Sequence, residues 1–278
     1  MPRPRRVERR PVWLRSAHHR DAVTIERPNT SGRRFMDRFF CPELRDHTTV
    51  TIADDEFHHL AHVLRVKPGE RVELFDGRGR AVECLVERIT KREAHLARTG
   101  NLREDEPDHI RLVLGVACPK GDRLKWLVEK ATELGVAELV PLKCERSVVE
   151  PRETKVAKLE QTILAACKQC RRNTLMSIGE SQSIEQFLKQ PARLSLIAHP
   201  GGRSFASMAR RLIDPDQADR ITVRAAIGPE GGFTDEEVAT AESLGALKLS
   251  LGRSILRVET AALAVSALVF GLSGLEEQ

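Results

Sequence analysis

The chain has 278 residues and a formal net charge of +5 at pH 7, with 41% hydrophobic residues, 4% aromatic residues and no tyrosine. This length allows one large domain or two smaller ones, and the hydrophobic content is sufficient for a packed core. So few aromatic side chains exclude extensive recognition of bases by stacking, and no apolar run reaches the ~20 residues that span a bilayer. The basic pI of about 9.0 favours a polyanionic partner.

The positive charge is concentrated at the start of the chain. Residues 1–35 contain ten arginines and three acidic residues, a net of +7, so the remaining residues sum to −2. This segment shows no sustained hydrophobic period and lacks the apolar stretch of a secretory signal. We expect 1–35 to be a basic, disordered extension; an arm that lies on RNA and a start codon placed too early are the alternatives.

Residues 36–105 contain short segments separated by turns. Thr49 to Ile52 and three runs within residues 72–97 alternate as antiparallel strands, and Asp54 to Leu64 is a predicted helix. Together they predict a small barrel. His58, His59 and His62 could suggest a metal cluster at helical spacing, but no fourth ligand accompanies them in this segment, so we expect no metal.

From residue 106 onward, strands alternate with helices. After a charged linker that ends near Pro107, apolar runs predict strands at 110–117, 136–142 and 194–198, with amphipathic helices between them. This alternation predicts a parallel sheet covered on both faces. Cys167-x-x-Cys170 falls late in a predicted helix, so coincidence is favoured over a redox or zinc role. The six scattered cysteines indicate a reduced, cytoplasmic protein.

Two strand–loop–helix units follow between residues 221 and 270. The strand Ile221 to Ile227 ends at a glycine-rich loop over 228–232, and Thr234 with Glu237 forms a capping box that opens a helix. A strand at 247–251, a loop at 252–257 and an apolar helix repeat the pattern. Both loops are expected at the carboxyl edge of one sheet, where open α/β sheets bind ligands. Neither loop matches the sequence motif of a phosphate-binding or dinucleotide-binding site.

The two loops resemble the cofactor loops of the trefoil-knotted (SPOUT) RNA methyltransferases. The matching stretches are Ile227-Gly228-Pro229-Glu230-Gly231-Gly232-Phe233 and Leu251-Gly252-x-x-Ile255-Leu256-Arg257-x-Glu259-Thr260-Ala261. More narrowly, the chain is similar to the family that methylates N3 of a uridine in 16S ribosomal RNA. Met36-Asp37-Arg38-Phe39-Phe40 resembles the usual start of that family, and His59, Val63-Leu64-Arg65 and Gly69 resemble its PUA-like barrel.

The resemblance implies a fold, a cofactor and a partner. It predicts an α/β protein with an N-terminal PUA-like RNA-binding β-barrel over 36–105, followed by a trefoil-knotted parallel-sheet methyltransferase domain over 106–278. It further implies that S-adenosylmethionine is the cofactor and that ribosomal RNA of the small subunit is the substrate.

The resemblance also assigns residues to a site. The implied cofactor-binding residues are Ala198, His199, Ile227, Gly228, Pro229, Glu230, Gly232, Leu251, Gly252, Ile255, Leu256 and Thr260. The basic residues assigned to RNA phosphates are Arg38, Arg65, Lys120, Arg123, Lys130, Arg146 and Arg172. By position, the candidate catalytic residues are Arg257, Glu230 and Glu259.

The implied chemistry is transfer of a sulfonium methyl to nitrogen. Uracil N3 carries a proton, so the site must supply a proton acceptor or donors that stabilise charge on the flanking carbonyls. The sequence does not choose the base, because Glu259 at a helix start could instead satisfy free backbone amides. Alternatives are a sister knotted enzyme that methylates another position in ribosomal or transfer RNA, and a non-catalytic RNA-binding protein of ribosome assembly.

Two further expectations concern the second domain. The helix Val258 to Phe270 has almost no polar face, which predicts burial on every side and favours a homodimer, with burial inside one chain as the alternative. In such a dimer Arg172 could reach the partner's site. The resembling family commonly has an acidic residue and a glycine where this chain has Lys168 and Arg171. We expect these two residues to make the patch around Arg172 more basic.

Overall fold

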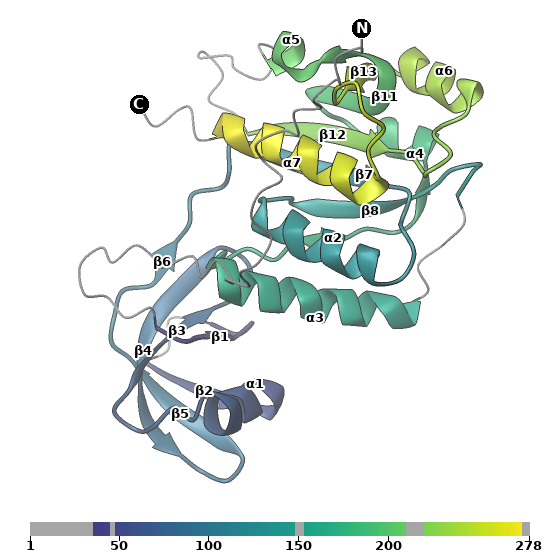
Figure 1. Ribbon diagram of the computed structural model, residues 1–278. Helices are drawn as coiled ribbons and strands as arrows, with labels where there is room; N and C mark the ends of the chain where they lie inside the picture. The colour runs from purple at the N-terminus through teal and green to yellow at the C-terminus, as the bar shows by residue number, and fades with distance from the viewer. Residues whose placement is uncertain (1–35, 45–47, 148–152, 210–219, 274–278) are drawn as a thin grey trace, which may run out of the picture. The chain divides into compact units, whose positions relative to one another are not determined.

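The computed structural model describes residues 36–44, 48–147, 153–209 and 220–273, and the expected extension 1–35 lies outside this range (Figure 1). Met36–Gln278 groups as one compact unit. It contains two sheets, one on each side of residue 105 in the sequence. No helix in the described part of the chain is long and apolar enough to cross a membrane.

The first sheet is the predicted PUA-like barrel. Its strand order is β1-β3-β4-β5-β2, with β6 paired to β4, and only the β1–β3 pair is parallel. The strands are β1 Arg38–Phe40, β2 Thr49–Ala53, β3 Arg71–Phe75, β4 Arg80–Ile89, β5 Glu93–Arg98 and β6 Arg103–Glu104. Alternate residues of β4, Val82, Cys84 and Val86, face the barrel core, as the period of two predicts.

The predicted helix Asp54 to Leu64 forms in two parts. α1 Asp54–His58 continues directly as the π-helix η2 His59–Val63. Phe57 and Leu60 are buried in the barrel core. His58 and His62 are exposed with their rings 5.1 Å apart, and the described residues hold no group of three or more side chains suited to a metal ion.

The second sheet is parallel throughout, as predicted. Its order is β10-β8-β7-β12-β11-β13, with β9 paired to β8. The strands are β7 Ile110–Val116, β8 Glu138–Lys143, β9 Ser177–Ile178, β10 Gln182–Ser183, β11 Leu194–Ser204, β12 Ile221–Ile227 and β13 Leu247–Ser250. The helices are α2 Asp122–Glu133, α3 Glu153–Cys170, α4 Ile184–Leu188, α5 Phe205–Ala209, α6 Asp235–Ser243 and α7 Val258–Ser273.

Both faces of this sheet are covered. Leu112 and Leu114 of β7 belong to one core with α2, α3 and α7, whereas Val113 between them belongs to the other core with α4 and α6 (Figure 1). A strand buried on both faces has no polar alternation, which is why these strands read as continuous apolar runs. The capping box of Thr234 and Glu237 is confirmed at the start of α6. A second box, Ser183 with Gln186, opens α4 and was not predicted.

β11 is longer than the sequence predicted. The expected strand ended at Ala198, but the chain shifts register there and pairs again with β13, where Arg203 lies opposite Leu249. Gly202 makes this possible, because a Cβ at Gly202 would lie 2.5 Å from the backbone carbon of Lys248 and 2.6 Å from backbone atoms of Leu249. Two backbones therefore pass each other with no room for a side chain.

The alternative that α7 is buried entirely inside one chain is not seen in the described part of the protein. Ala262, Val265 and Val269 are buried against the sheet, but Leu268 is 39% and Phe270 is 55% exposed. The sheet covers one face of the helix, and an apolar outer face remains.

The crossing at Gly202 generates a stability prediction. Gly202→Ala should lower the free energy of unfolding by about 1–3 kcal/mol, as over-packing does, because the new Cβ would meet backbone atoms that cannot rotate away. For a domain of this size that corresponds to a fall of roughly 2–4 °C per kcal/mol in Tm. Gly201→Ala is the matched control, since its Cβ would lie 3.4 Å from the His199 ring, an ordinary contact. Equal melting temperatures for the two variants by calorimetry would contradict this account.

Candidate active site

A pocket of about 180 Å³ lies at the carboxyl edge of the parallel sheet, beyond β11, β12 and β13. Three chain segments form its walls, 198–200 after the regular part of β11, 228–233 after β12 and 249–258 around the end of β13. The parallel strands bring these segments together because all of them end on the same side of the sheet.

The first loop, 228–233, is held in shape by its own residues. The amide of Gly232 donates to the Pro229 carbonyl at 2.8 Å, and Gly232 has a φ of 71° that favours glycine. A Cβ on Gly228 would lie 2.9 Å from the ring of Phe233, so this glycine lets the ring fold back under the loop. The capping box of α6 begins at the next residue, Thr234. The loop therefore presents backbone groups from a fixed conformation.

The second loop, 251–257, closes the other side. Leu251 and Leu256 pack on the core of the sheet, whereas Ile255 is 94% exposed at the pocket rim. Gly252 has a φ of 116°, a conformation that L side chains rarely adopt. The loop thus combines an anchored base with an exposed apolar tip.

The structure brings together eleven of the twelve residues predicted to bind the cofactor. These eleven line the pocket: Ala198, His199, Ile227, Gly228, Pro229, Glu230, Gly232, Leu251, Gly252, Ile255 and Leu256. Thr260 is exposed on α7 and is not part of the lining. The lining residues that were not predicted are Pro200, Phe233, Leu249, Arg253, Ser254, Val258 and Ala261. Most of them adjoin predicted residues, and that adjacency was the available signal.

Two carboxylates and one arginine meet beside the first loop. Arg123 of α2 places Nη1 2.7 Å from Oε1 of Glu230 and 3.8 Å from Oε2 of Glu259. The hydrogen bond to Glu230 raises the pKa of Arg123. Glu259 is only 5% exposed, and its Oε2 has no hydrogen-bond partner among the described residues. That oxygen is not satisfying a backbone amide of α7, which was the structural alternative for Glu259.

A hollow of about 130 Å³ adjoins the first loop on its other side. Lys120, Arg123 and Arg146 line it, so three of the seven basic residues predicted to bind RNA gather here. Arg146 donates from Nη1 to the Gly231 carbonyl at 2.8 Å, which ties the hollow to the first loop. Cys118 also lines the hollow, and burial raises the pKa of its thiol to about 12, so the group stays neutral near pH 7. The wall therefore offers cations and no thiolate nucleophile.

The other four residues predicted to bind RNA lie elsewhere. Arg65 is exposed on the barrel, and Lys130 forms ion pairs with Glu129 and Glu133 on α2. Arg172 donates to the carbonyls of Thr132 and Val136, near the end of α2, which is about 18 Å of helix away from its start beside the first loop.

The position of Arg38 does not fit its predicted role as a contact for RNA phosphates. Its side chain is buried, with 5% of the residue exposed. It forms an ion pair with Glu73 and donates hydrogen bonds to the Cys167 carbonyl and to Asn173. A guanidinium committed in this way is not available to an RNA phosphate.

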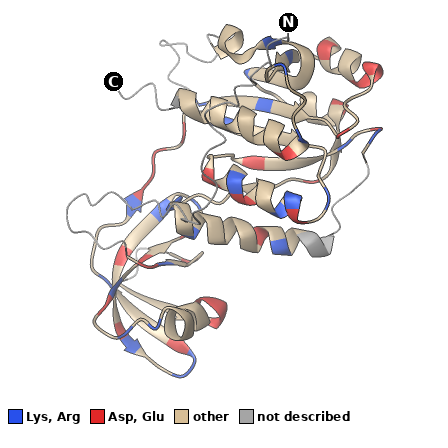
Figure 2. Ribbon diagram, in the orientation of Figure 1, with Lys and Arg blue, Asp and Glu red and all other residues tan. Residues whose placement is uncertain are grey.

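Charge of both signs is mixed along the elements near the site (Figure 2). A groove of about 990 Å³ between α2 and α3 illustrates the mixing, because three lysines and three acidic residues line it. These residues are Lys125, Lys130, Lys158, Asp122, Glu129 and Glu133. Their charges cancel, so this larger groove provides no field for a polyanion. The hollow beside the first loop is lined by three basic residues and one acidic residue, Glu230, so its charges leave a net positive balance.

The pocket has the chemistry of a site for a flat or cationic ligand. Leu249, Leu251 and Ala261 supply apolar surface, the two loops supply backbone donors and acceptors, and Glu230 is the single carboxylate of the lining. An apolar cleft with a few placed polar groups is the usual form of a cofactor site.

Comparisons with known proteins agree with this geometry. Residues 106–270 match the family described as an RNA methyltransferase domain, and residues 52–97 match the RNA methyltransferase PUA domain. Ribosomal RNA small subunit methyltransferase E from Mycobacterium tuberculosis is 30% identical over 81% of this chain and 87% of its own length.

Two solved structures are similar to the fold as a whole. Ribosomal RNA small subunit methyltransferase E from Neisseria gonorrhoeae bound to S-adenosylmethionine is 30% identical, with a TM-score of 0.73 over 85% of this chain and 98% of its own. A methyltransferase from Legionella pneumophila in complex with the same cofactor is also 30% identical, with a TM-score of 0.73 over 85% and 97% of the two chains. The two loops lie together at the edge of the sheet, and the barrel precedes this domain in the sequence. The chain belongs to the RNA methyltransferase family that includes ribosomal RNA small subunit methyltransferase E.

Proposed function

We propose that this protein transfers a methyl group from S-adenosylmethionine to N3 of a uridine in 16S ribosomal RNA of the small subunit. The observation that carries the proposal is the single pocket in which eleven of the twelve residues predicted for the cofactor meet. The name shared by the relatives supports the class of RNA.

The pocket fits S-adenosylmethionine by its donor set. When bound, the cofactor supplies a methyl group activated by a sulfonium. The backbone of 228–232 and of 251–256 would hold its adenine and ribose, and Leu249 with Ala261 would cover the ring. Glu230, at the rim, would lie on the side of the positive sulfur, where a carboxylate stabilises a cation.

In this proposal Glu230 accepts the proton of uracil N3. It is the only carboxylate that lines the pocket, and 62% of its side chain is exposed, so it can reach a bound base. Arg257, at the end of the second loop, is exposed and does not line the pocket, and its side chain forms no hydrogen bond or ion pair within the described parts of the chain. A free guanidinium there can donate to a uracil carbonyl, where negative charge develops as the proton leaves.

Glu259 has a different role in this proposal. It is buried, it does not line the pocket, and its nearest charged neighbour is Arg123. Arg123 thus lies between a buried and an exposed carboxylate, and Glu259 would hold it in reach of Glu230. Glu259 is then a positioning residue that keeps the arginine beside the proton acceptor.

The RNA surface would be shared between two parts of the chain. The barrel over 36–105 would hold the RNA, with Arg65 as one contact, and the domain over 106–278 would carry out the transfer with Lys120, Arg123 and Arg146 on phosphates. Lys120 is exposed and has no hydrogen-bond or ion-pair partner among the described residues, which makes it the best placed of these. An activity on ribosomal RNA and the presence of free cysteines are both consistent with a location in the cytoplasm.

A homodimer would complete the second domain. The outer face of α7 exposes Leu268 and Phe270, and α2, which packs beside α7, exposes Trp126. Exposed apolar side chains gathered on neighbouring helices are typical of protein interfaces. A second copy of the chain is the occupant we propose, and its Arg172 would then be brought to the first copy's pocket.

The first prediction concerns the cofactor. S-adenosylmethionine should raise Tm in proportion to RT ln(1 + [L]/Kd), whereas ATP and NAD should not. Gly252→Val should abolish the shift, because Gly252 lies in the pocket wall. Gly245→Val is the matched control, since Gly245 also has a positive φ, 84°, but lies outside the pocket. Both variants should lose similar stability, and only Gly245→Val should keep the shift. A shift retained by Gly252→Val would count against this pocket.

The second prediction concerns the product. Protein incubated with S-adenosylmethionine and small subunits from a strain that lacks the modification should yield 3-methyluridine by mass spectrometry of digested RNA. Glu230→Gln should lower kcat by about 10²–10⁴, the usual contribution of a general base. S-adenosylmethionine should still raise its Tm, but by less than in the wild-type protein, because the charge beside the sulfonium is lost. Glu236→Gln, an exposed carboxylate on α6, is the control.

Other outcomes would decide between the alternatives. Methylation of a ribose hydroxyl or of transfer RNA would identify a sister enzyme. RNA binding without methylation of any substrate would identify a non-catalytic protein of ribosome assembly.

The third prediction concerns the dimer. Leu268→Glu should convert dimers to monomers in analytical ultracentrifugation and lower methyl transfer, because an unpaired charge would be buried in an apolar interface. Ala239→Glu, an exposed position on α6, places the same charge elsewhere and should change neither property. A wild-type monomer at micromolar concentration with full activity would refute the dimer.

A further inference from the structure

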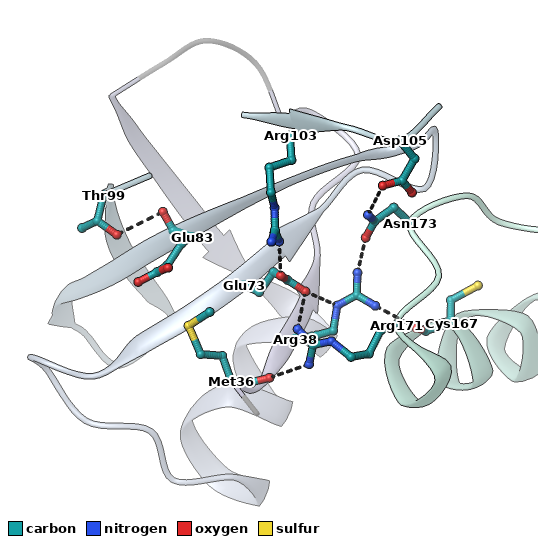
Figure 3. A network of polar contacts seen from close by, with 10 residues as sticks. All are labelled: Met36, Arg38, Glu73, Glu83, Thr99, Arg103, Asp105, Cys167, Arg171 and Asn173. Carbon is teal, nitrogen blue, oxygen red and sulfur yellow. Dashed lines mark hydrogen bonds and ion pairs between the residues drawn. The ribbon is translucent and has the colours of Figure 1, made fainter. Parts of the chain in front are cut away.

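One buried carboxylate joins three arginines where the barrel meets the end of α3 (Figure 3). Oε1 of Glu73, in β3, lies 2.6 Å from Nε of Arg38 and 2.9 Å from Nη2 of Arg171, and Oε2 pairs with Arg103. Arg38 and Arg103 belong to the barrel, whereas Arg171 follows α3. Glu73 therefore connects the two parts of the chain through a single side chain.

A second ion pair lies close by. Nζ of Lys168 pairs with Oε1 of Glu56 in α1, and the two side chains are only 16% and 18% exposed. The other oxygen of Glu56 accepts a hydrogen bond from the amide of Phe40 at 3.0 Å. Glu56 is thus held by β1 on one side and holds α3 on the other.

Further hydrogen bonds run along the same seam. The Cys167 carbonyl accepts from Arg38 at 3.0 Å, and the Asn173 side chain donates to Asp105 at 2.9 Å. The backbone joins as well, because Gly79 donates to the Asn173 carbonyl at 3.1 Å and Leu175 donates to the Gly77 carbonyl at 2.9 Å. Residues 167–175 therefore bind the barrel as a continuous strip.

These contacts contradict the expectation that Lys168 and Arg171 enlarge an RNA-binding patch. Each is paired with a carboxylate of the barrel, and turning either one toward RNA would leave a buried acid with less compensation. Arg171 also has a φ of 67°, where glycine is favoured. Its side chain contact offsets that backbone cost.

We propose that Lys168 and Arg171 form an ionic lock with Glu56 and Glu73, which fixes the barrel against α3 so that RNA reaches the pocket in one orientation. This inference rests on the proposed function, since it concerns how the substrate meets that site. Buried ion pairs often contribute more to geometry than to net stability. The four residues of the lock are therefore positioning residues, and they contact neither the RNA nor the cofactor.

The first test separates the lock from an RNA-binding patch. Affinity for a 16S ribosomal RNA fragment is measured by fluorescence anisotropy over a range of salt concentrations. Lys120→Ala should reduce the slope of log K against log salt by about 1, the value for one phosphate contact. Lys168→Met and Arg171→Gly should leave the slope unchanged. A slope reduced in these two variants as much as in Lys120→Ala would overturn the lock.

The second test is a double-mutant cycle on Glu56→Gln and Lys168→Met. Each single variant should raise KM for RNA about 5- to 10-fold, within the range of coupled neighbouring residues, with kcat at saturating RNA and the affinity for S-adenosylmethionine unchanged. The double variant should raise KM by clearly less than the product of the two single effects. Independent, multiplying effects, or a loss confined to kcat, would overturn the proposal.

The same four proteins can be compared without RNA. Thermal unfolding should show the same coupling, with the double variant losing less Tm than the two single losses together. This readout tests the contact even if the wild-type protein methylates no RNA, in which case the proposed function fails and the lock does not. Independent losses of Tm would show that Lys168 and Glu56 are not coupled.

Discussion

The binding pocket depends on the close passage of two backbones at Gly202. Because no side chain stands between them, β11 continues beyond its register shift and pairs a second time with β13. That second pairing places His199 and Pro200 opposite the loop that follows β13. Together with the loop after β12, three separate segments of the chain come to one edge of the sheet. The ligand site is thus a consequence of strand pairing.

Positive and negative charges are nearly balanced over most of the chain. Residues 36–278 carry nearly balanced charge, so RNA recognition cannot rest on a general positive field. Most cations near the seam and along α2 are paired with carboxylates, and few remain free. The side chains of Lys120 and Arg257 have no partner among the described residues. Lys120 lines the hollow beside the first loop, and Arg257 ends the second loop. The proposed electrostatic contact with RNA is therefore local, and it lies where the reaction would take place.

Arginine also serves the fold in this protein. Arg38 and Arg172 were expected on RNA, yet one fills the barrel junction and the other binds the carbonyls near the end of α2. A guanidinium has several donors in a fixed plane, which suits it to join carbonyls and carboxylates from different elements. The ionic lock uses this property at Arg171. In α7, by contrast, the apolar side chains of Leu268 and Phe270 remain exposed among the described residues.

Local pattern alone determined much of this protein. Apolar runs and turns predicted the principal strands and helices, and the capping box at Thr234 fixed the start of α6. The resemblance of the two loops to those of a known family indicated nine of the residues that line the pocket. These features depend on neighbours in the sequence, so the sequence displays them. What tertiary structure decided were the partners of charged side chains and the coverage of α7. The sequence does not distinguish an arginine that binds a phosphate from one that binds a buried carboxylate. Only the packing of the chain brings Glu73 to Arg38 and Arg171.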